Sequence, residues 1–296
     1  MILVVGSTGM VGSEVCRLLA EKGLPFRAFV RESSDPAKLE RLRGYGAQFI
    51  KGDLCDPLSL KAACQGVSAV ICTVSAMPFS YKPGVNDIQS VDCDGVTCLI
   101  DAAKAAGVKH FVYTSFSGNI NRDFPLCAGK RTVEQHLKES GLVYTILRPG
   151  YFMEVWLSPA VGFDAANAKA TVYGSGDQPL AWISLRDVAQ FAVDSLENPA
   201  ARNRVLELGG PQSLSPHQVI KVFEEATGKT FEVAHVPPEA LQAQYDGAVD
   251  PMQKSFIGLM LCYAAGDPID MGAVQKSFAT RLTPISEFVT SMLAPA

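Results

Sequence analysis

Three glycines near the N-terminus have the spacing of a phosphate-binding loop. Gly6, Gly9 and Gly12 form the pattern G-x-x-G-x-x-G, directly after the apolar run Ile2–Val5 and at the start of a segment with helical periodicity. Turns also collect glycine for steric reasons alone. A strand, a tight turn and a helix N-terminus in succession, however, let backbone amides approach a pyrophosphate, which predicts dinucleotide binding. The predicted loop residues are Gly6, Ser7, Thr8, Gly9, Met10, Val11 and Gly12.

The residue after the second apolar run indicates which dinucleotide is bound. An acidic residue there accepts hydrogen bonds from a ribose 2′-hydroxyl and signals NAD, whereas an arginine suits the 2′-phosphate of NADP. In this chain Arg31 follows Phe26–Val30, and Ser33 and Lys38 come shortly after it. A guanidinium binds phosphate as a planar fork, and a hydroxyl with a second cation completes a pocket for a dianion. We therefore predict NADP(H); a solvated loop cation is the alternative for Arg31.

Asp53 follows the third predicted strand and is a candidate for contact with the adenine. Its carboxylate suits the adenine amino group, and Leu54 would pack on the ring. The alternative is that Asp53 caps the helix that starts at Pro57, a role that Asp56 fits better.

These motifs need a framework of strands and helices to position them. Up to about residue 150, short apolar runs alternate with amphipathic segments, which is typical of βαβ units. The predicted strands are Ile2–Val5, Phe26–Val30, Ala47–Lys51, Ala69–Thr73, His110–Thr114 and Tyr144–Arg148. The predicted helices are Gly12–Lys22, Pro36–Tyr45, Leu58–Gln65, Asp87–Ala106 and Lys130–Ser140, and Gly23, Gly46, Gly66, Gly107 and Gly141 follow them in the position of a C-terminal cap. The expected fold is an α/β, doubly wound (Rossmann) parallel sheet, in a dinucleotide-binding domain of residues 1–150.

After Gly150 the pattern becomes less regular, with more proline and glycine. Residues 151–296 are predicted to form a smaller, less regular substrate-capping region. Segments near residues 182–210 are expected to return to the sheet: Trp182–Glu197 as a strand end with a helix, and Arg204–Leu208 as a strand. The rest of the cap is predicted from Ser215–Thr227, Phe231–Val236 and helical stretches between residues 239 and 293.

Composition excludes several classes of protein. The chain has 296 residues, of which 48% are hydrophobic and 19% charged, as expected of a globular protein. A net charge of −4 offers no broad basic surface for nucleic acid. The apolar stretch Phe256–Ala265 is too short to cross a bilayer, and the N-terminus lacks the basic segment of a signal peptide, so a cytoplasmic location is expected. Eight cysteines without a C-x-x-C pair predict reduced thiols and no metal site.

Five motifs together resemble the atypical short-chain dehydrogenase/reductases and, among them, the NmrA-like, NAD(P)H-binding family. The motifs are the glycine loop, Val30-Arg31, Gly46-Ala47 with Gly52-Asp53-Leu54, the run from Gly107 to Ser115, and Ser140-Gly141-Leu142 leading to the run from Thr145 to Pro149. The resemblance covers roughly the first 210 residues well and the cap loosely. It implies further cofactor contacts at the ends of strands. These are Ser75 and Ala76 for the adenosine and ribose, Thr114 and Ser115 near the nicotinamide, Lys130 for the nicotinamide ribose, and Pro149, Gly150, Tyr151 and Phe152 beside the carboxamide.

One departure concerns the proton donor. The wider superfamily carries Y-x-x-x-K, but the residue four before Lys130 is Leu126, which cannot donate a proton. Isoflavone-reductase-like members also lack this tyrosine and are thought to use the lysine, while NmrA-like regulators bind the cofactor without known turnover. Lys130 is predicted to open a helix, where a cation opposes the helix dipole, so a functional reason for it is favoured over an ion pair with Glu134. The candidate catalytic residues are Lys130, Tyr113 and Tyr81.

Aromatic and methionine side chains after strand ends are candidates for a substrate pocket, because open α/β sheets bind ligands there. They are Met77, Phe79, Tyr81, Phe116, Tyr151, Phe152 and Trp156. Core packing is the alternative, notably for Phe152 and Trp156 at helical spacing. The expected function is NADPH-dependent reduction of a small, mostly apolar carbonyl, enone or quinone-like compound by a monomer or homodimer. The alternative is a catalytically silent NADP(H) sensor or assembly factor that acts through a protein partner.

Overall fold

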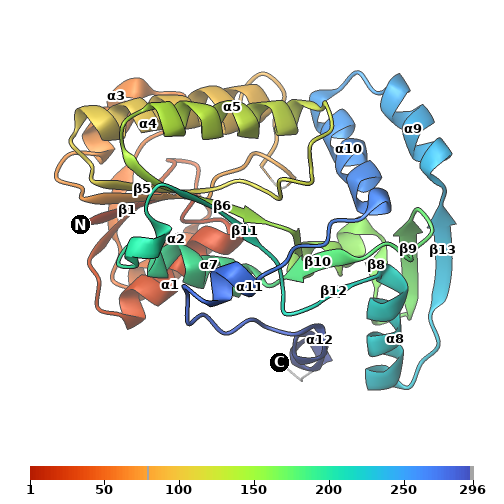
Figure 1. Cartoon of the computed structure of the whole chain (residues 1–296). Coiled ribbons are helices and arrows are strands. Elements are labelled where there is room, and N and C mark those ends of the chain that lie inside the picture. Colours follow the sequence, from red (N-terminus) through yellow and green to blue (C-terminus); the bar gives the residue numbers. More distant parts are fainter. Residues whose placement is uncertain (79, 294–296) are drawn as a thin grey trace. The chain divides into compact units, whose positions relative to one another are not determined.

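The computed structural model describes residues 1–78 and 80–293 (Figure 1). The chain divides into two compact units. The first unit comprises Met1–Ser115, Pro125–Arg148 and Val188–Leu206. The second unit comprises Phe116–Phe124, Pro149–Asp187 and Glu207–Ala296.

A seven-stranded sheet organises the first unit. Its strands are β1 (Ile2–Val5), β2 (Phe26–Val30), β3 (Gln48–Lys51), β4 (Ala69–Cys72), β5 (His110–Thr114), β6 (Val143–Pro149) and β11 (Arg204–Leu208). They lie in the order β11-β6-β5-β4-β1-β2-β3, and the pairs from β3 across to β6 are parallel. At the other edge, Asn203 donates to Tyr144 and Gly150 to Leu208, so β11 also runs parallel to β6. The predicted Rossmann-type α/β fold is confirmed, and so is the return of Arg204–Leu208 to the sheet.

The helices of this unit are α1 (Met10–Glu21), α2 (Pro36–Gly44), α3 (Pro57–Ala63), α4 (Val96–Ala105), α5 (Pro125–Glu139) and α7 (Leu185–Asp194). Most of them bury an apolar stripe, and α1 packs on β1 and β2 through Val15 and Leu19. One core joins Val70 and Phe111 of the sheet to Leu99 of α4 and Val133 of α5, all fully buried. The prediction of one helix over residues 87–106 was wrong in type, because a π-helix (Ile88–Gly95) precedes α4. Its first turn is fixed by a capping box between Asp87 and Ser90.

The start of α5 also differs from the prediction. The helix begins at Pro125, five residues before Lys130, so Lys130 lies in its second turn and not at its N-terminus. Proline suits the first turn of a helix, and Leu126 and Cys127 extend the buried face. The argument that Lys130 opposes the helix dipole therefore fails.

The second unit contains two small three-stranded sheets. One has the order β12 (Ser213–Leu214), β10 (Leu180–Ile183), β7 (Tyr151–Phe152), and the other β13 (Glu232–Val236), β9 (Lys169–Tyr173), β8 (Phe163–Asp164). The prediction that the strand at Trp182 returns to the main sheet was wrong, since β10 pairs with β7 and β12. Gly150 permits this pairing: a side chain there would come within 2.3 Å of the Ala181 carbonyl oxygen.

The helices of the second unit are α6 (Met153–Trp156), α8 (Pro216–Thr227), α9 (Pro238–Gly247), α10 (Pro251–Ala265), α11 (Gly272–Gln275) and α12 (Ile285–Leu293). Short 3₁₀ turns cover Pro159–Val161 in this unit and Pro199–Ala201 in the first. Of the segments assigned to the cap, Ser215–Thr227 contains α8, which begins with a capping box between Ser215 and Gln218, and Phe231–Val236 contains β13. Within the described residues, every helix is too short or too polar to cross a membrane.

A buried histidine on β5 links the first unit's stability to pH. Burial, and to a lesser degree the charge of Arg202, lowers the pKa of His110 from its ordinary value of 6.5 to about 4. His110 Nε2 lies 2.9 Å from Thr145 Oγ1, whose proton goes to the Ala201 carbonyl oxygen at 2.8 Å. The neutral imidazole therefore donates from Nε2 to the threonine hydroxyl.

This histidine predicts acid destabilisation. Between pH 6.5 and about 4 the unfolded chain binds a proton that the folded chain excludes, so stability falls as the pH falls through this window. From pH 7 to pH 5 the loss from this group is about 1–2 kcal/mol. Urea unfolding of His110→Gln should show a correspondingly shallower pH dependence than the wild type. Equal slopes for wild type and His110→Gln would contradict the assignment.

Candidate functional site

The three glycines of the N-terminal loop lie in different steric environments. Gly6 has a φ of +87°, and a Cβ at Gly12 would come within 2.1 Å of the Gly6 carbonyl oxygen. The packing of the chain itself therefore requires both glycines. Gly9 is exposed and extended, and its Cβ would meet only the Gly6 carbonyl oxygen, at 3.1 Å. The loop thus leaves the outer side of Gly9 open.

The N-terminus of α1 fits an anionic ligand. Gly9 is its N-cap residue, no side chain caps the helix, and no acidic residue lies in its first turn. The first amides of a helix have no partners within the helix, so this terminus carries uncapped donors and partial positive charge. Met10 is 42% exposed, whereas the Ser7 hydroxyl is buried and donates to the Phe29 carbonyl oxygen. Thr8 and Val11 are half-buried beside these amides.

Arg31 lies where the sequence places it, at the end of β2. It is half-buried, and its guanidinium donates to Asn86 Oδ1 at 2.8 Å, so it is not a freely solvated cation. Ser33 and Lys38 are exposed, and Lys38 lies in the first turn of α2. These three side chains are near one another in sequence, and Arg31 alone among them makes a side-chain hydrogen bond in the described residues.

The loop after β3 shows which aspartate is the helix cap. Asp56 accepts from the Leu58 amide at 3.0 Å and is the N-cap of α3, as predicted. Asp53 instead accepts from the Cys55 amide at 2.9 Å. Leu54 is 8% exposed and belongs to the core beneath α4, a position that does not favour packing on an adenine ring.

The loop ends of β4 and β5 contain buried polar contacts. Ala76 is fully buried, and its amide donates to Asp92 Oδ2 at 2.9 Å, while Ser75 Oγ accepts from the Met77 amide. Among the described residues the buried Thr114 hydroxyl finds no hydrogen-bond partner. Ser115 lies 3.4 Å from a guanidinium nitrogen of Arg131.

Lys130 is held inside the first unit by three contacts. It is 4% exposed, and its Nζ lies 3.3 Å from Asp92 Oδ1. The same ammonium donates to the Val74 carbonyl oxygen at 3.2 Å and lies 5.3 Å from the centre of the Tyr113 ring. The lysine therefore joins α5 to the π-helix and to the end of β4.

The ion pair considered between Lys130 and Glu134 is not present. Glu134 is buried and accepts from Arg131 at 2.5 Å and from Arg148 Nε at 3.0 Å. Burial raises the pKa of Glu134, but hydrogen bonds from Arg148 and Ser115 and the two guanidinium charges hold it below its ordinary value. Glu134 is thus satisfied by arginines, which leaves Asp92 as the partner of Lys130.

Asp92 is a site residue that the sequence reasoning missed. Its side chain is fully buried, and Oδ1 lacks a hydrogen bond within the described residues although Lys130 faces it. The sequence carries a signal for this placement. Asp92 lies four residues after Ile88 and four before Val96, on the apolar stripe that faces the core. A carboxylate on such a stripe needs a cationic partner.

The two candidate tyrosines occupy different environments. The Tyr113 hydroxyl is completely buried without a hydrogen-bond partner in the described chain, and burial raises its pKa well above the ordinary value. This position in the core does not favour Tyr113 as a proton donor. Tyr81 is half-buried against the same core.

The aromatic candidates of the second unit form a core of their own. Tyr151 is 1% exposed, with its ring 4.9 Å from that of Trp156 and 5.5 Å from that of Tyr263. Phe152 ends β7 and precedes α6, so it does not share a helix with Trp156. Pro149 and Gly150 are buried. These placements favour core packing, the alternative to substrate contact, for Tyr151 and Trp156.

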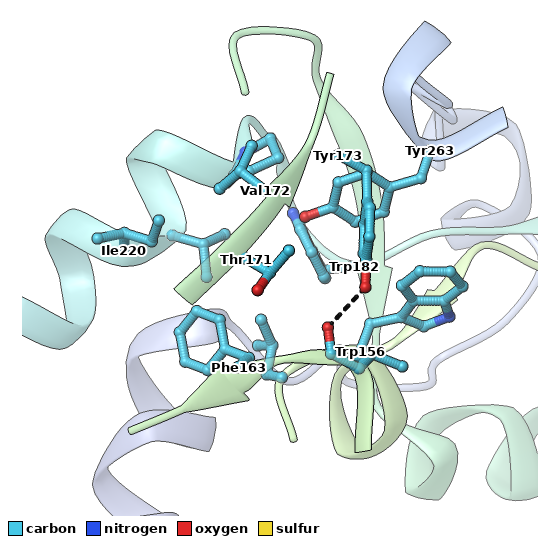
Figure 2. Close-up of a pocket in the computed structure, with 12 residues that line it drawn as sticks. Trp156, Phe163, Thr171, Val172, Tyr173, Trp182, Ile220 and Tyr263 are labelled. Carbon is cyan, nitrogen blue, oxygen red and sulfur yellow. Dashed lines mark hydrogen bonds between the residues drawn. The ribbon is translucent and has the colours of Figure 1, made fainter. Parts of the chain in front are cut away.

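A small cavity lies within this aromatic core (Figure 2). Trp156, Thr171 and Tyr263 line it, and the Tyr173 hydroxyl donates across it to the Val161 carbonyl oxygen at 2.9 Å (Figure 2). Its space suffices for about one water molecule, so as it stands it does not fit an organic substrate. Of the remaining candidates, Met77 is half-buried, the Phe116 ring lies 6.4 Å from Phe124, and Phe79 is outside the described residues.

Comparison with known proteins gives a family match over most of the chain. The model of the NmrA-like family matches residues 1–289. An NAD(P)H azoreductase from Xenophilus azovorans is 39% identical over 247 residues, covering 82% of this chain and 80% of that protein. A photosystem II assembly factor, Ycf39, from Trieres chinensis is 30% identical over 238 residues, covering 80% and 72%. A structure of an NADPH-dependent quinone oxidoreductase from Escherichia coli superposes with a TM-score of 0.79 at 24% identity, covering 99% of this chain and 100% of that one, which shows a shared fold.

Proposed function

This chain belongs to the NmrA-like family, and from that membership and the site described above we propose that it is an NADPH-dependent oxidoreductase. Its proposed substrates are small, mostly apolar carbonyl, enone or quinone-like compounds. The observation that carries the proposal is the N-terminus of α1, which has no side-chain cap and begins at the exposed Gly9. Arg31 follows the neighbouring strand β2. The azoreductase relative supports a reductase and adds azo compounds to the substrates worth testing.

The residues of the first unit have distinct roles in this proposal. The amides of the glycine loop bind the pyrophosphate, and Arg31 binds the 2′-phosphate. When bound, NADPH supplies the hydride. The Lys130 ammonium, now held by Asp92 and the Val74 carbonyl oxygen, would bind the nicotinamide ribose and stabilise negative charge on the substrate oxygen, or pass a proton to it from water. One hydride and one proton together convert a carbonyl group to an alcohol.

Arg31 is expected to carry the preference for NADPH over NADH. Arg31→Ala removes a charge-assisted bond to the 2′-phosphate, so NADPH should bind about tenfold to a hundredfold more weakly. NADH, which lacks this phosphate, should bind almost unchanged. Calorimetric titration with both cofactors measures the difference. Arg43→Ala, which removes an exposed cation from α2, serves as the control and should leave both affinities in place. Equal losses for the two cofactors in Arg31→Ala would overturn the assignment.

A catalytically silent role is the second candidate. Leu126 replaces the usual tyrosine donor, and the relative from Trieres chinensis is described as an assembly factor. The two candidates separate in one assay, which follows NADPH oxidation against aldehydes, enones, quinones and azo compounds. Turnover supports the oxidoreductase. Tight NADPH binding without oxidation by any acceptor supports a sensor or assembly factor that acts through a protein partner.

A further inference from the structure

A short hairpin before the π-helix holds Asn86 in a fixed position. Lys82 and Asn86 exchange two backbone hydrogen bonds, both of 2.9 Å. The Val85 amide also donates to the Lys82 carbonyl oxygen, at 3.1 Å. Asp87, the next residue, accepts from the Gly84 amide at 2.9 Å and caps the π-helix. The backbone at Asn86 is therefore constrained from both sides.

The hydrogen bonds of Asn86 also fix the orientation of its side-chain amide. Nδ2 lies 2.5 Å from the Ser80 carbonyl oxygen and 3.2 Å from the Ser80 hydroxyl. Rotating the amide by half a turn would place Oδ1 against the Ser80 carbonyl oxygen, which is also an acceptor. It would place Nδ2 against the Arg31 guanidinium, which is also a donor. Oδ1 therefore faces the guanidinium of Arg31, at 2.8 Å.

Asn86 orients Arg31 without neutralising it. A guanidinium has five N–H donors in a rigid fork, and one of them goes to Asn86. In the part of the chain that the structure describes, Arg31 forms no ion pair with a carboxylate. The Arg31 backbone is fixed as well, since its amide donates to Ser34 Oγ at 3.0 Å. Within the described residues, Arg31 therefore keeps its positive charge in a fixed direction, and Asn86 uses one of its five side-chain donors.

We infer that Asn86 is a positioning residue for cofactor selection, which holds the Arg31 guanidinium ready for the 2′-phosphate of NADPH. This inference rests on the proposed function, because it needs Arg31 to bind that phosphate. Holding a flexible arginine in its binding geometry before the ligand arrives lowers the entropy lost on binding. Asn86 thus determines the preference between NADPH and NADH through Arg31, from a position 55 residues away in the sequence.

A double-mutant cycle with calorimetry tests the inference on the full-length protein. Asn86→Ala should weaken NADPH about three- to tenfold, the scale of one hydrogen bond, and leave NADH within about twofold. In the Arg31→Ala background, Asn86→Ala should weaken NADPH no further, because the residue through which it acts is gone. Val85→Ala on the same hairpin is the matched control, since the Val85 side chain is 71% exposed, and it should change neither affinity.

The outcomes distinguish this inference from the proposed function. Equal weakening of NADPH and NADH by Asn86→Ala, or the same effect in both backgrounds, would mean that Asn86 only stabilises the loop. If Arg31→Ala abolishes the NADPH preference while Asn86→Ala leaves it intact, the positioning role is wrong and the cofactor assignment stands. If Arg31→Ala itself leaves the preference for NADPH intact, both the positioning role of Asn86 and the assignment of Arg31 to the 2′-phosphate are wrong. Bound NADH reports a folded site in each variant.

Discussion

Removing the Lys130 ammonium should lower kcat about 10²- to 10⁴-fold, while NADPH affinity changes about tenfold or less. The large effect is expected on kcat because charge develops on the substrate oxygen during hydride transfer, whereas contact with the ribose contributes to binding alone. Steady-state NADPH oxidation, with the best acceptor of the panel, and calorimetry measure the two quantities.

The buried ion pair between Lys130 and Asp92 determines which variants this experiment needs. Lys130→Ala alone leaves the carboxylate of Asp92 buried without a partner, which costs about 3–5 kcal/mol and confuses misfolding with lost catalysis. Lys130→Met combined with Asp92→Asn removes both charges at similar volume, and the asparagine side chain keeps an acceptor for the Ala76 amide. Asp92→Asn alone retains the ammonium but leaves it buried without a counter-charge, so it serves as the control only where thermal unfolding shows that it is folded; its kcat should then stay within about tenfold of wild type. If the double variant turns over as fast as this control, Lys130 is structural and protons reach the substrate from Tyr81 or water.

Gly9→Val should abolish detectable NADPH binding and leave the protein folded. The new side chain would occupy the open side of the loop, where the pyrophosphate needs the backbone amides. Gly9 is exposed and its backbone is extended, and a Cβ there meets the Gly6 carbonyl oxygen at 3.1 Å, so valine requires a small shift of the loop but no refolding of the chain. Calorimetry measures binding, and circular dichroism with thermal unfolding measures the fold.

Gly12→Ala is the informative comparison for this variant. A methyl group at Gly12 meets the Gly6 carbonyl oxygen at 2.1 Å, so it should lower thermal stability with or without cofactor. Normal NADPH binding by Gly9→Val would place the phosphates elsewhere.

Local patterns predicted the framework of the first unit well. The strand predicted over His110–Thr114 has those bounds in the structure. Its five buried residues stand between a glycine turn and a polar loop, and both of these mark where a strand must end. Gly23, Gly46, Gly66, Gly107 and Gly141 all have positive φ, as their predicted role at helix ends requires. These features depend on a few neighbouring residues, which is the range over which sequence patterns carry information.

Contacts between distant segments were not predictable in the same way. A π-helix has a wider turn than an α-helix, but the eight residues of Ile88–Gly95 are too short a run for periodicity to separate them from α4. The partners of Lys130 and Arg31 come from that π-helix and from the hairpin before it, and only the folded chain brings them together. The prediction that the strand at Trp182 joins the main sheet was wrong for a related reason. The pairing of β10 with β7 depends on Gly150, which lies in another segment of the chain.

The steric roles of Gly6 and Gly12 limit how well the glycine motif indicates nucleotide binding in other members of the family. Both glycines are retained by contacts within the chain, so natural selection for folding alone preserves them. A descendant that had stopped using a nucleotide would still display most of the fingerprint, and Gly9, whose Cβ contact of 3.1 Å is the least severe of the three, would be the first to change. In a survey of such sequences, substitution at this one middle position should separate descendants that have lost the ligand from those that keep it.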